Sequence, residues 1–350
     1  MKKLLCLTAI FAFNYSFGQT IPTPDHILIV MYENRDYTEI VGNPSAPYIN
    51  SLLSDTSTAL FTNSNGLASG SQPNYLMLFS GSDQGVVDNT ITSTQFTSCN
   101  LGYSLTSSGH TFRGYSEDLP SVGYLGTSSG MYYRKHNPWS NWQGTGANQL
   151  PDSLNLPLTY LPGSYDSLST VSFIVPNQND DMHTPSDSTG IAPGDAWLHT
   201  HLDSYIHWAK THNSLVIFTF DESSAAVGEH ILTFFSGQYV HGGSYGESID
   251  NYRILRSIED MYHLSLCGNS SSSTPITSFW KVNHTGIKEN AAETNEISLW
   301  PVPSTGNLNL NIKSTVSENI TIVVSDPLGR IVMQKNSEIG PGANQLHFNF

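Results

Sequence analysis

A serine followed two residues later by a proline offers the first chemistry in this chain. Pro73 suits the first turn of a helix, so Ser71 is expected where a helix begins, near free backbone N–H groups and the positive end of the helix dipole. Such a position binds anions, and it favours the alkoxide of a nucleophilic serine. On this stretch alone a plain helix cap is the simpler interpretation. Carboxylates elsewhere in the chain favour the nucleophile.

Acidic side chains follow three apolar segments that are typical of strands buried on both faces. Glu33 follows the run 27–32, Asp181 and His183 follow the run 170–176, and Asp221 and Glu222 follow the run 215–220. Functional groups of open α/β sheets lie at the carboxyl ends of strands, so we expect these side chains at one edge of a parallel sheet. Carboxylates suit hard divalent cations, and histidine suits zinc or another transition ion. Each carboxylate taken alone is equally typical of an ordinary loop.

A rare basic cluster lies at 134–136, where Arg, Lys and His are adjacent in an otherwise acidic chain. It is a candidate for contacting an anionic substrate, and a solvated loop is an equal alternative. A later segment, 196–211, is expected to form an amphipathic helix capped by Gly194 and Asp195. Its histidines are assigned no role.

Composition narrows the class of protein. The chain has 350 residues and a net charge of −15, which argues against a nucleic-acid partner and a polybasic membrane anchor. Two lysines, a short apolar run and small residues predict a secretory signal peptide over 1–19, too short to span a bilayer. Cys99 and Cys267 remain in the mature chain. Pairing and free buried thiols are both open.

The remaining chain is expected to form a catalytic domain at 20–280, a polar linker at 281–296 and a small antiparallel β module at 297–350. The module begins with Trp300-Pro301-Val302-Pro303 and contains the turn Asp326-Pro327-Leu328-Gly329. On these residues it resembles the type IX secretion sorting domain of Bacteroidetes. That family's Gly-x-Tyr strand and basic terminus are missing here, which leaves open an incomplete module and, with it, retention in the periplasm.

Several spaced motifs resemble the acid phosphatase/phospholipase C phosphoesterases of the alkaline phosphatase-like superfamily, over roughly residues 25 to 265. They are Glu33-Asn34, Ser71-Gln72-Pro73-Asn74-Tyr75, Lys135-His136-Asn137-Pro138, Asp181-Met182-His183, Asp221-Glu222 and Leu255-Arg256-Ser257-Ile258-Glu259-Asp260. The resemblance implies an α/β fold, with a central, mostly parallel sheet flanked by helices. The C-terminal module would add a small antiparallel β-sandwich.

The resemblance also implies roles for single residues. A divalent metal ion would be held by Glu33, Asn34, Asp221 and Glu222, and Asp181 would be a further ligand or would orient His183. Ser71 would be the nucleophile and Asn74 would bind a phosphoryl oxygen. His183 and His136 would lie at the phosphate, one of them as acid for the leaving group. One departure is Asn251, where the family often has histidine; His241 is a candidate replacement.

The implied activity is that of a secreted or cell-surface acid phosphatase that hydrolyses phosphate monoesters through a phosphoserine. A phospholipase C or phosphodiesterase is the first alternative, and a non-catalytic surface binding protein on the same fold is the second. The implied partners are a phosphate-ester substrate and the type IX secretion machinery. No nucleic-acid partner and no transmembrane anchor are expected.

Overall fold

The computed structural model describes residues 21–224, 229–281, 297–300, 307–325 and 331–349. The chain divides into two compact units, one ending at Val282 and one beginning at Asn283. The expected signal peptide and nearly all of the expected linker lie outside the described residues. Among the helices that are described, none combines the length and the apolar character that crossing a membrane requires.

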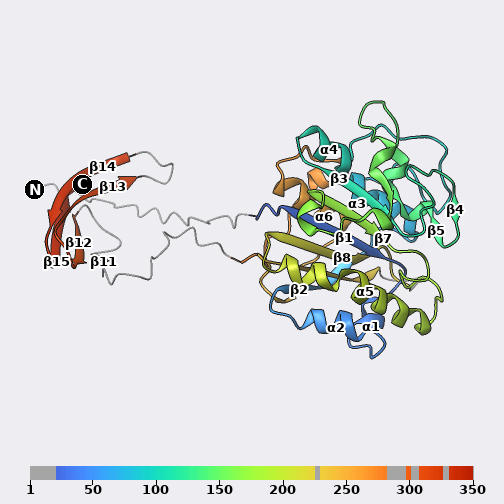
Figure 1. The fold of residues 1–350 in the computed structure, drawn as a ribbon, viewed down its shortest axis with the longest axis horizontal. Coiled ribbons are helices and arrows are strands. Elements are labelled where there is room, and N and C mark those ends of the chain that lie inside the picture. The colour runs from blue at the N-terminus through green and yellow to red at the C-terminus, as the bar shows by residue number, and fades with distance from the viewer. Residues whose placement is uncertain (1–20, 225–228, 282–296, 301–306, 326–330, 350) are drawn as a thin grey trace, which may run out of the picture. The chain divides into compact units, whose positions relative to one another are not determined.

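The first unit is built on an eight-stranded sheet (Figure 1). In spatial order its strands are β10 (Gly243–Tyr245), β2 (Thr58–Asn65), β9 (His230–Gly237), β8 (Ser214–Phe220), β1 (His26–Tyr32), β7 (Val171–Val175), β3 (Phe112–Ser116) and β6 (Asn155–Pro157). All neighbours are parallel except that β9 runs antiparallel to both β8 and β2. The expected mostly parallel sheet is confirmed.

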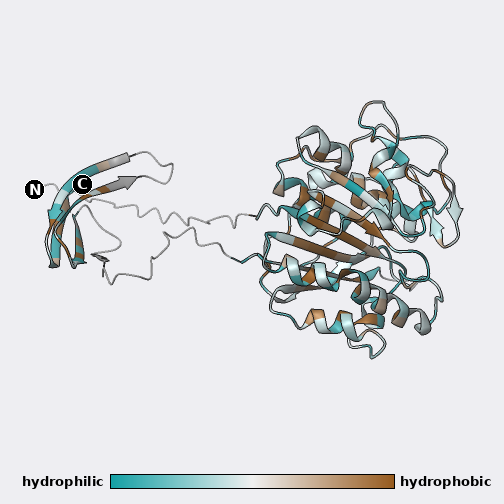
Figure 2. Ribbon diagram, in the orientation of Figure 1, coloured by the Kyte–Doolittle hydropathy of each residue, from teal (hydrophilic) through white to brown (hydrophobic). Residues whose placement is uncertain are grey.

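The three apolar runs form the centre of this sheet. Strand β1 pairs in parallel with β7 on one side and with β8 on the other, and Tyr32 is level with Phe220. Every residue of β7 and β8 is buried, and Figure 2 shows hydrophobic residues gathered along the central strands. The carboxylates that follow these strands therefore meet at one edge.

Helices cover both faces of the sheet. One face packs against α3 (Ser71–Ser80), α4 (Leu101–Ser107) and α6 (Asn251–Met261). The opposite face packs against α1 (Tyr37–Ile40), α2 (Pro47–Leu53) and α5 (Ile191–Ala209), as Figure 1 also shows. Alternate residues of β1 point to the two cores, Ile27, Ile29 and Met31 to the first and Leu28, Val30 and Tyr32 to the second.

Helix α5 begins earlier than expected, so the predicted cap at Gly194 and Asp195 is wrong. The helix starts at Ile191, and Pro193 is tolerated in its first turn, where its missing N–H has no intrahelical partner to lose. The carboxylate of Asp195 instead accepts the backbone N–H groups of Tyr48 at 2.9 Å and Ile49 at 2.8 Å. Asp195 therefore caps α2, not its own helix.

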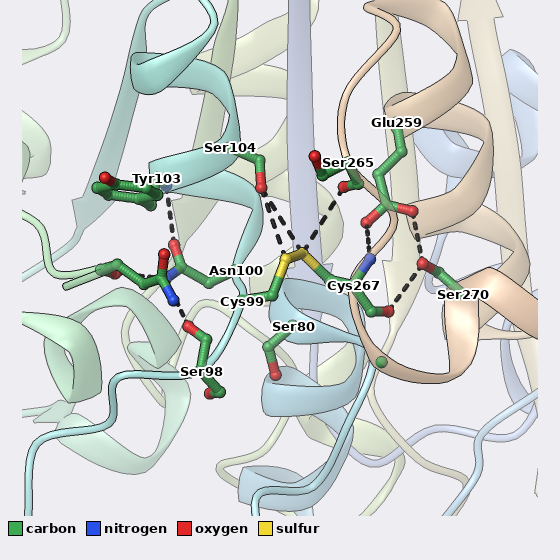
Figure 3. The surroundings of a disulfide bond; sticks show 12 residues. Ser80, Ser98, Cys99, Asn100, Tyr103, Ser104, Glu259, Ser265, Cys267 and Ser270 are labelled. Atoms are coloured by element: carbon green, nitrogen blue, oxygen red, sulfur yellow. Dashed lines mark hydrogen bonds between the residues drawn. A yellow bond between two sulfur atoms is a disulfide. The ribbon is translucent and has the colours of Figure 1, made fainter.

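A disulfide joins Cys99 to Cys267 across 168 residues of sequence, with 5.3 Å between their Cα atoms (Figure 3). The loop after Cys267 also contacts the end of α3, because the N–H of Asn269 donates to the carbonyl of Gly81 at 2.8 Å. A side chain at Gly81 would collide with the carbonyl of Cys267, and its φ of +70° is one that glycine adopts without strain. Of the two alternatives left open by the sequence, the cysteines take the paired one.

The second unit is antiparallel. One sheet has the order β11 (Ile297–Trp300), β12 (Asn307–Ser314), β15 (Gly342–Asn349), and a second pairs β13 (Glu318–Ser325) with β14 (Ile331–Ile339). Leu310, Ile312, Ile339 and Phe348 form its buried cluster, which draws on both sheets. The Pro-rich start at 301–303 and the expected turn at 326–329 lie outside the described residues.

Candidate metal and phosphoryl site

Ser71 is the first residue of α3, and the cap position belongs to Gly70, whose φ is +140°. Ser71 is fully buried, and the contacts described for its hydroxyl are with side chains and not with a backbone N–H of the helix. The hydroxyl donates instead to Glu33 Oε2 at 2.9 Å and lies 3.2 Å from Glu222 Oε1. The plain helix-cap interpretation of Ser71 is therefore wrong, because its side chain points at two carboxylates.

Backbone hydrogen bonds hold the strand ends together. The N–H of Glu33 donates to the carbonyl of Asp181, and the N–H of Asp221 donates to the carbonyl of Tyr32, both at 2.9 Å. The N–H of Asn34 donates to Asp221 Oδ1 at 2.9 Å, which Asn34 reaches with a φ of +51°. Three side chains far apart in the sequence are thus fixed at the sheet edge by their own main chain.

The basic cluster comes to the same place. Its residues form the short helix η1 (Arg134–His136), and His136 is buried with its ring stacked on Tyr75 of α3. His136 Nε2 lies 3.1 Å from Glu33 Oε1, and Nδ1 lies 3.7 Å from Asp181 Oδ2. Lys135 Nζ lies 3.5 Å from Ser71 Oγ. The cluster therefore supplies a cation beside the serine and an imidazole between two carboxylates.

Several buried polar atoms here make no hydrogen bond of normal geometry. They are Glu33 Oε1, His136 Nε2, Asp181 Oδ2 and Asp221 Oδ2. Glu33, His136 and Asp181 each offer one ligand atom, and these atoms lie within 4.8 Å of one another. Buried polar groups are normally satisfied, and carboxylate with imidazole is a donor set that divalent ions accept. The residues present fit a metal ion.

The electrostatics support the same conclusion. Burial, and after it the negative charge of Glu33, raise the pKa of Asp181 well above its usual value. Burial and the charges of Glu33 and Glu222 do the same to the pKa of Asp221. Burial lowers the pKa of His136, which favours the neutral imidazole that can bind a metal. A bound cation would remove the conflict between these carboxylates.

The two asparagines predicted from the sequence to lie at the site, Asn34 and Asn74, have different surroundings. Asn34 Nδ2 lies 3.5 Å from Glu33 Oε2, so this residue is at the site. Asn74 is fully buried, and its amide nitrogen donates to the carbonyls of Ala68 at 2.6 Å and Gly70 at 3.1 Å. In this arrangement Asn74 holds the loop that precedes Ser71, and its phosphoryl role stays a prediction.

Backbone groups near Ser71 are also engaged. The N–H of Gly70 donates to Glu222 Oε2, and the N–H of Gln72 donates to Asn89 Oδ1 at 2.9 Å. The side-chain oxygens of Glu222 and Asn89 thus occupy the N-terminus of α3, where the partial positive charge of the helix favours an anion. A phosphoryl oxygen bound to either amide would take the place of one of these side chains.

His183 lies at the rim of the site. Its backbone N–H donates to Asp181 Oδ1 at 2.9 Å, so Asp181 fixes this loop while its other oxygen faces His136. The His183 ring is 6.4 Å from that of His136 and only partly buried. Burial lowers its pKa.

Asn251 and His241 make no described contact with Ser71 or with the sheet-edge carboxylates. Asn251 is buried where α6 meets α3, and its amide donates to the carbonyl of Asn74 at 3.2 Å. His241 Nδ1 lies 3.1 Å from the hydroxyl of Tyr245 on edge strand β10. Among the described contacts, neither side chain reaches Ser71 or the carboxylates, so a replacement of the family histidine by His241 finds no support.

Sequence reasoning missed two supporting residues. Arg35 is buried and donates to the carbonyls of Met182, Pro185, Ser186 and Asp187, which ties the loop carrying His183 to the end of β1. Tyr75 stacks on His136, and its hydroxyl is buried without a normal hydrogen bond. Arg35 is signalled only by its position after Glu33-Asn34, whereas Tyr75 belongs to the Ser71 motif, which assigns it no role.

Comparison with known proteins agrees with this geometry. Residues 43–265 match the phosphoesterase family, and residues 298–350 match a secretion system C-terminal sorting domain. A phosphatidylinositol-3-phosphatase of Mycobacterium tuberculosis is 42% identical over 265 residues, covering 75% of this chain and 85% of that protein. A crystal structure of an alkaline phosphatase superfamily protein from Vibrio parahaemolyticus matches with a TM-score of 0.51 at 11% identity, over 94% of this chain and 80% of that one. The structural likeness shows the fold, and the sorting domain, identified as type IX, indicates secretion or the cell surface.

Proposed function

Because the chain belongs to the phosphoesterase family, we propose that it is a metal-dependent acid phosphatase that hydrolyses phosphate monoesters through a phosphoserine on Ser71. The observation that carries the proposal is the position of Ser71 Oγ, 2.9 Å from Glu33, 3.2 Å from Glu222 and 3.5 Å from Lys135. A nucleophile next to hydrogen-bond acceptors and a cation suits attack on a phosphate.

The proposed metal ligands are Glu33, Asp181, Asp221 and His136, with Asn34 and Glu222 beside them. A divalent cation held there would stabilise the negative charge that develops on the phosphoryl oxygens. Lys135 adds a second positive charge next to Ser71.

In the proposed reaction the hydroxyl proton of Ser71 leaves along one of its two short contacts, to Glu33 or Glu222. The Ser71 oxygen attacks phosphorus, the ester P–O bond breaks, and the alcohol leaves with a proton. His183 is the better placed donor of that proton, because it is partly exposed while His136 is buried between carboxylates. Water then cleaves the phosphoserine and releases phosphate.

A phosphomonoesterase is favoured over a phospholipase C by what surrounds Ser71. The open pocket beside it is lined by serines, Asn34 and two glutamates, without an apolar side chain among the lining residues described. The M. tuberculosis relative is also a phosphatase by name. A non-catalytic binding protein is the weaker alternative, since the residue that suggested it, Asn251, contacts the main chain of α3 and not the site.

The test is hydrolysis of p-nitrophenyl phosphate and bis-p-nitrophenyl phosphate by the mature chain, with and without EDTA, from acid to neutral pH. Monoester turnover that EDTA removes and a divalent cation restores is the expected result. Turnover of the diester alone would move the assignment to a phosphodiesterase. No turnover with any added cation would contradict the proposal and leave the binding protein.

A further inference from the structure

A pocket of about 620 Å³ opens beside the nucleophile, a size within the usual range for small-molecule sites. We call it the acidic pocket. It is lined by four serines together with Asn34, Glu222 and Glu229. Glu222 lies 3.2 Å from Ser71 Oγ, and Ser69 is two residues from Ser71, so the pocket adjoins the reacting atom.

Charge is distributed unevenly around Ser71. The acidic pocket has two carboxylates and no Lys, Arg or His among the described residues that line it. Lys135, the cation 3.5 Å from Ser71 Oγ, is not among the lining residues. The phosphoryl group and the rest of a substrate would therefore meet opposite charges.

Glu229 is held in place at this pocket. One of its oxygens accepts the hydroxyl of Ser69 at 3.0 Å, and the other accepts the backbone N–H of Ser223 at 3.0 Å. Neither Glu229 nor Glu222 forms an ion pair with a described residue. The charge of Glu229 therefore remains available to a ligand, and the serine hydroxyls can donate or accept.

We propose that the acidic pocket binds the alcohol part of the substrate and selects phosphate monoesters whose alcohol carries hydroxyl or ammonium groups and no second anionic group. This inference rests on the proposed function. Hydroxyl and ammonium groups donate hydrogen bonds to carboxylates, whereas a second anion would approach the two glutamates of a pocket that no described Lys, Arg or His lines. At separations of about 5 to 7 Å in a largely solvated pocket, each such charge pair changes affinity by about three- to tenfold.

The test uses three monoesters of similar size whose far ends differ in charge: phosphoethanolamine, glycerol 3-phosphate and 3-phosphoglycerate. The expected order of kcat/KM is cationic, then neutral, then anionic, with about a tenfold or larger span that shrinks in 0.5 M NaCl because salt screens exposed charges. Equal values, a preference for 3-phosphoglycerate, or an order that salt leaves unchanged would overturn the inference.

Variants locate the effect. Glu229→Gln should narrow the span by about three- to tenfold, and Glu229→Asp, which keeps the charge, should preserve the order. Glu247→Gln is the matched control, because Glu247 pairs with Arg253 and does not line the pocket. A span unchanged in Glu229→Gln would assign the selection elsewhere and overturn the inference. If the protein hydrolyses p-nitrophenyl phosphate but does not discriminate among the three charged-end esters, only this inference is refuted. If it hydrolyses none of the four esters, the proposed function is refuted as well.

Discussion

Carboxylates are buried in two regions of the first unit, and their hydrogen bonding differs. At the sheet edge Glu33, Asp181 and Asp221 are fully buried, and each keeps an oxygen without a hydrogen bond. On α6, Glu259 is equally buried, but one oxygen accepts the N–H of Cys267 at 2.8 Å and the other lies 2.5 Å from Ser270 Oγ, as Figure 3 shows. The sheet-edge carboxylates therefore keep oxygens without a hydrogen-bond donor, whereas both oxygens of Glu259 have a hydrogen-bond partner.

In the second region, protonation of Glu259 removes the buried charge without a metal ion. Ser270 Oγ also lies 2.8 Å from the carbonyl of Cys267, and a hydroxyl has one hydrogen to donate. A protonated Glu259 that donates to Ser270 satisfies every atom, and burial raises the pKa of Glu259 to about 7. At the sheet edge, burial and then the facing Glu33 raise the pKa of Asp181 and of Asp221, and a bound cation would relieve this repulsion. On this difference we base the proposal that the sheet-edge carboxylates bind a metal and that Glu259 is structural.

The largest expected effect is the loss of activity when the proposed nucleophile at the sheet edge is removed. Ser71→Ala should lower kcat on p-nitrophenyl phosphate at least about a thousandfold, because no other described hydroxyl lies between Glu33, Glu222 and Lys135. Ser80→Ala is the control at the other end of α3, where the hydroxyl bonds the carbonyl of Leu76 at 2.8 Å. Equal activities of the two variants would remove Ser71 from the mechanism.

Breaking the disulfide should affect the second region and spare the first. Cys99→Ser with Cys267→Ser should lower the free energy of unfolding by about 2 to 5 kcal/mol, since the bond closes a long loop. The ten residues of α3 put about 15 Å between Ser71 and the disulfide end of the helix, so kcat at 25 °C should stay within about twofold. Denaturant unfolding and steady-state kinetics measure the two effects. A large loss of kcat in folded protein would show that the regions are coupled.

Glu259 should make stability depend on pH with a definite sign. Its folded-state pKa of about 7 is above the usual 4.5, so its contribution is full below about pH 4.5 and is lost as pH rises through 7. The loss is at most about 3 kcal/mol. Glu259→Gln, whose amide can donate to Ser270, should flatten the curve. Unfolding of both proteins from pH 5 to 8 gives the difference, and parallel curves would show that Glu259 is charged in the native state.

A divalent cation should stabilise the protein through the sheet-edge carboxylates. At about a hundred times its Kd, a divalent ion adds about 2.7 kcal/mol to the stability of wild-type protein, seen as a higher Tm. Asp221→Asn should lose this gain and should be no less stable than wild type in EDTA, because the amide cannot ionise beside Glu33 and keeps an acceptor for the N–H of Asn34. A full cation shift in the variant would exclude Asp221 as a ligand.

Much of the fold followed from the sequence, because buried parallel strands are continuous apolar runs that differ from everything around them. The runs ending at Glu33, Asp181 and Asp221 became β1, β7 and β8, and their shared edge followed from strand direction. The start of α5 did not, since Asp195 reads locally as a cap while its partners lie in α2. Local patterns do not report tertiary partners.

The candidate site was predictable in part for the same reason. Residues at strand ends and at a helix start have positions fixed by topology. His136 comes from a loop of short helices, and only the folded chain shows it between Glu33 and Asp181. Likewise, Asn74 lies in a matching motif and Asn251 marks a departure from one, but the pattern does not reveal their hydrogen bonds to the main chain, which depend on tertiary packing.

Direct binding of divalent ions tests the central claim, that the unsatisfied carboxylates at the sheet edge hold a metal. Equilibrium dialysis of the EDTA-stripped mature chain against zinc, manganese, magnesium and calcium, followed by elemental analysis, would measure it in wild type, Glu33→Gln and Glu259→Gln. We predict at least one bound ion per wild-type chain, loss of binding in Glu33→Gln and wild-type binding in Glu259→Gln. No bound ion in wild type, or equal binding in all three proteins, would contradict the claim.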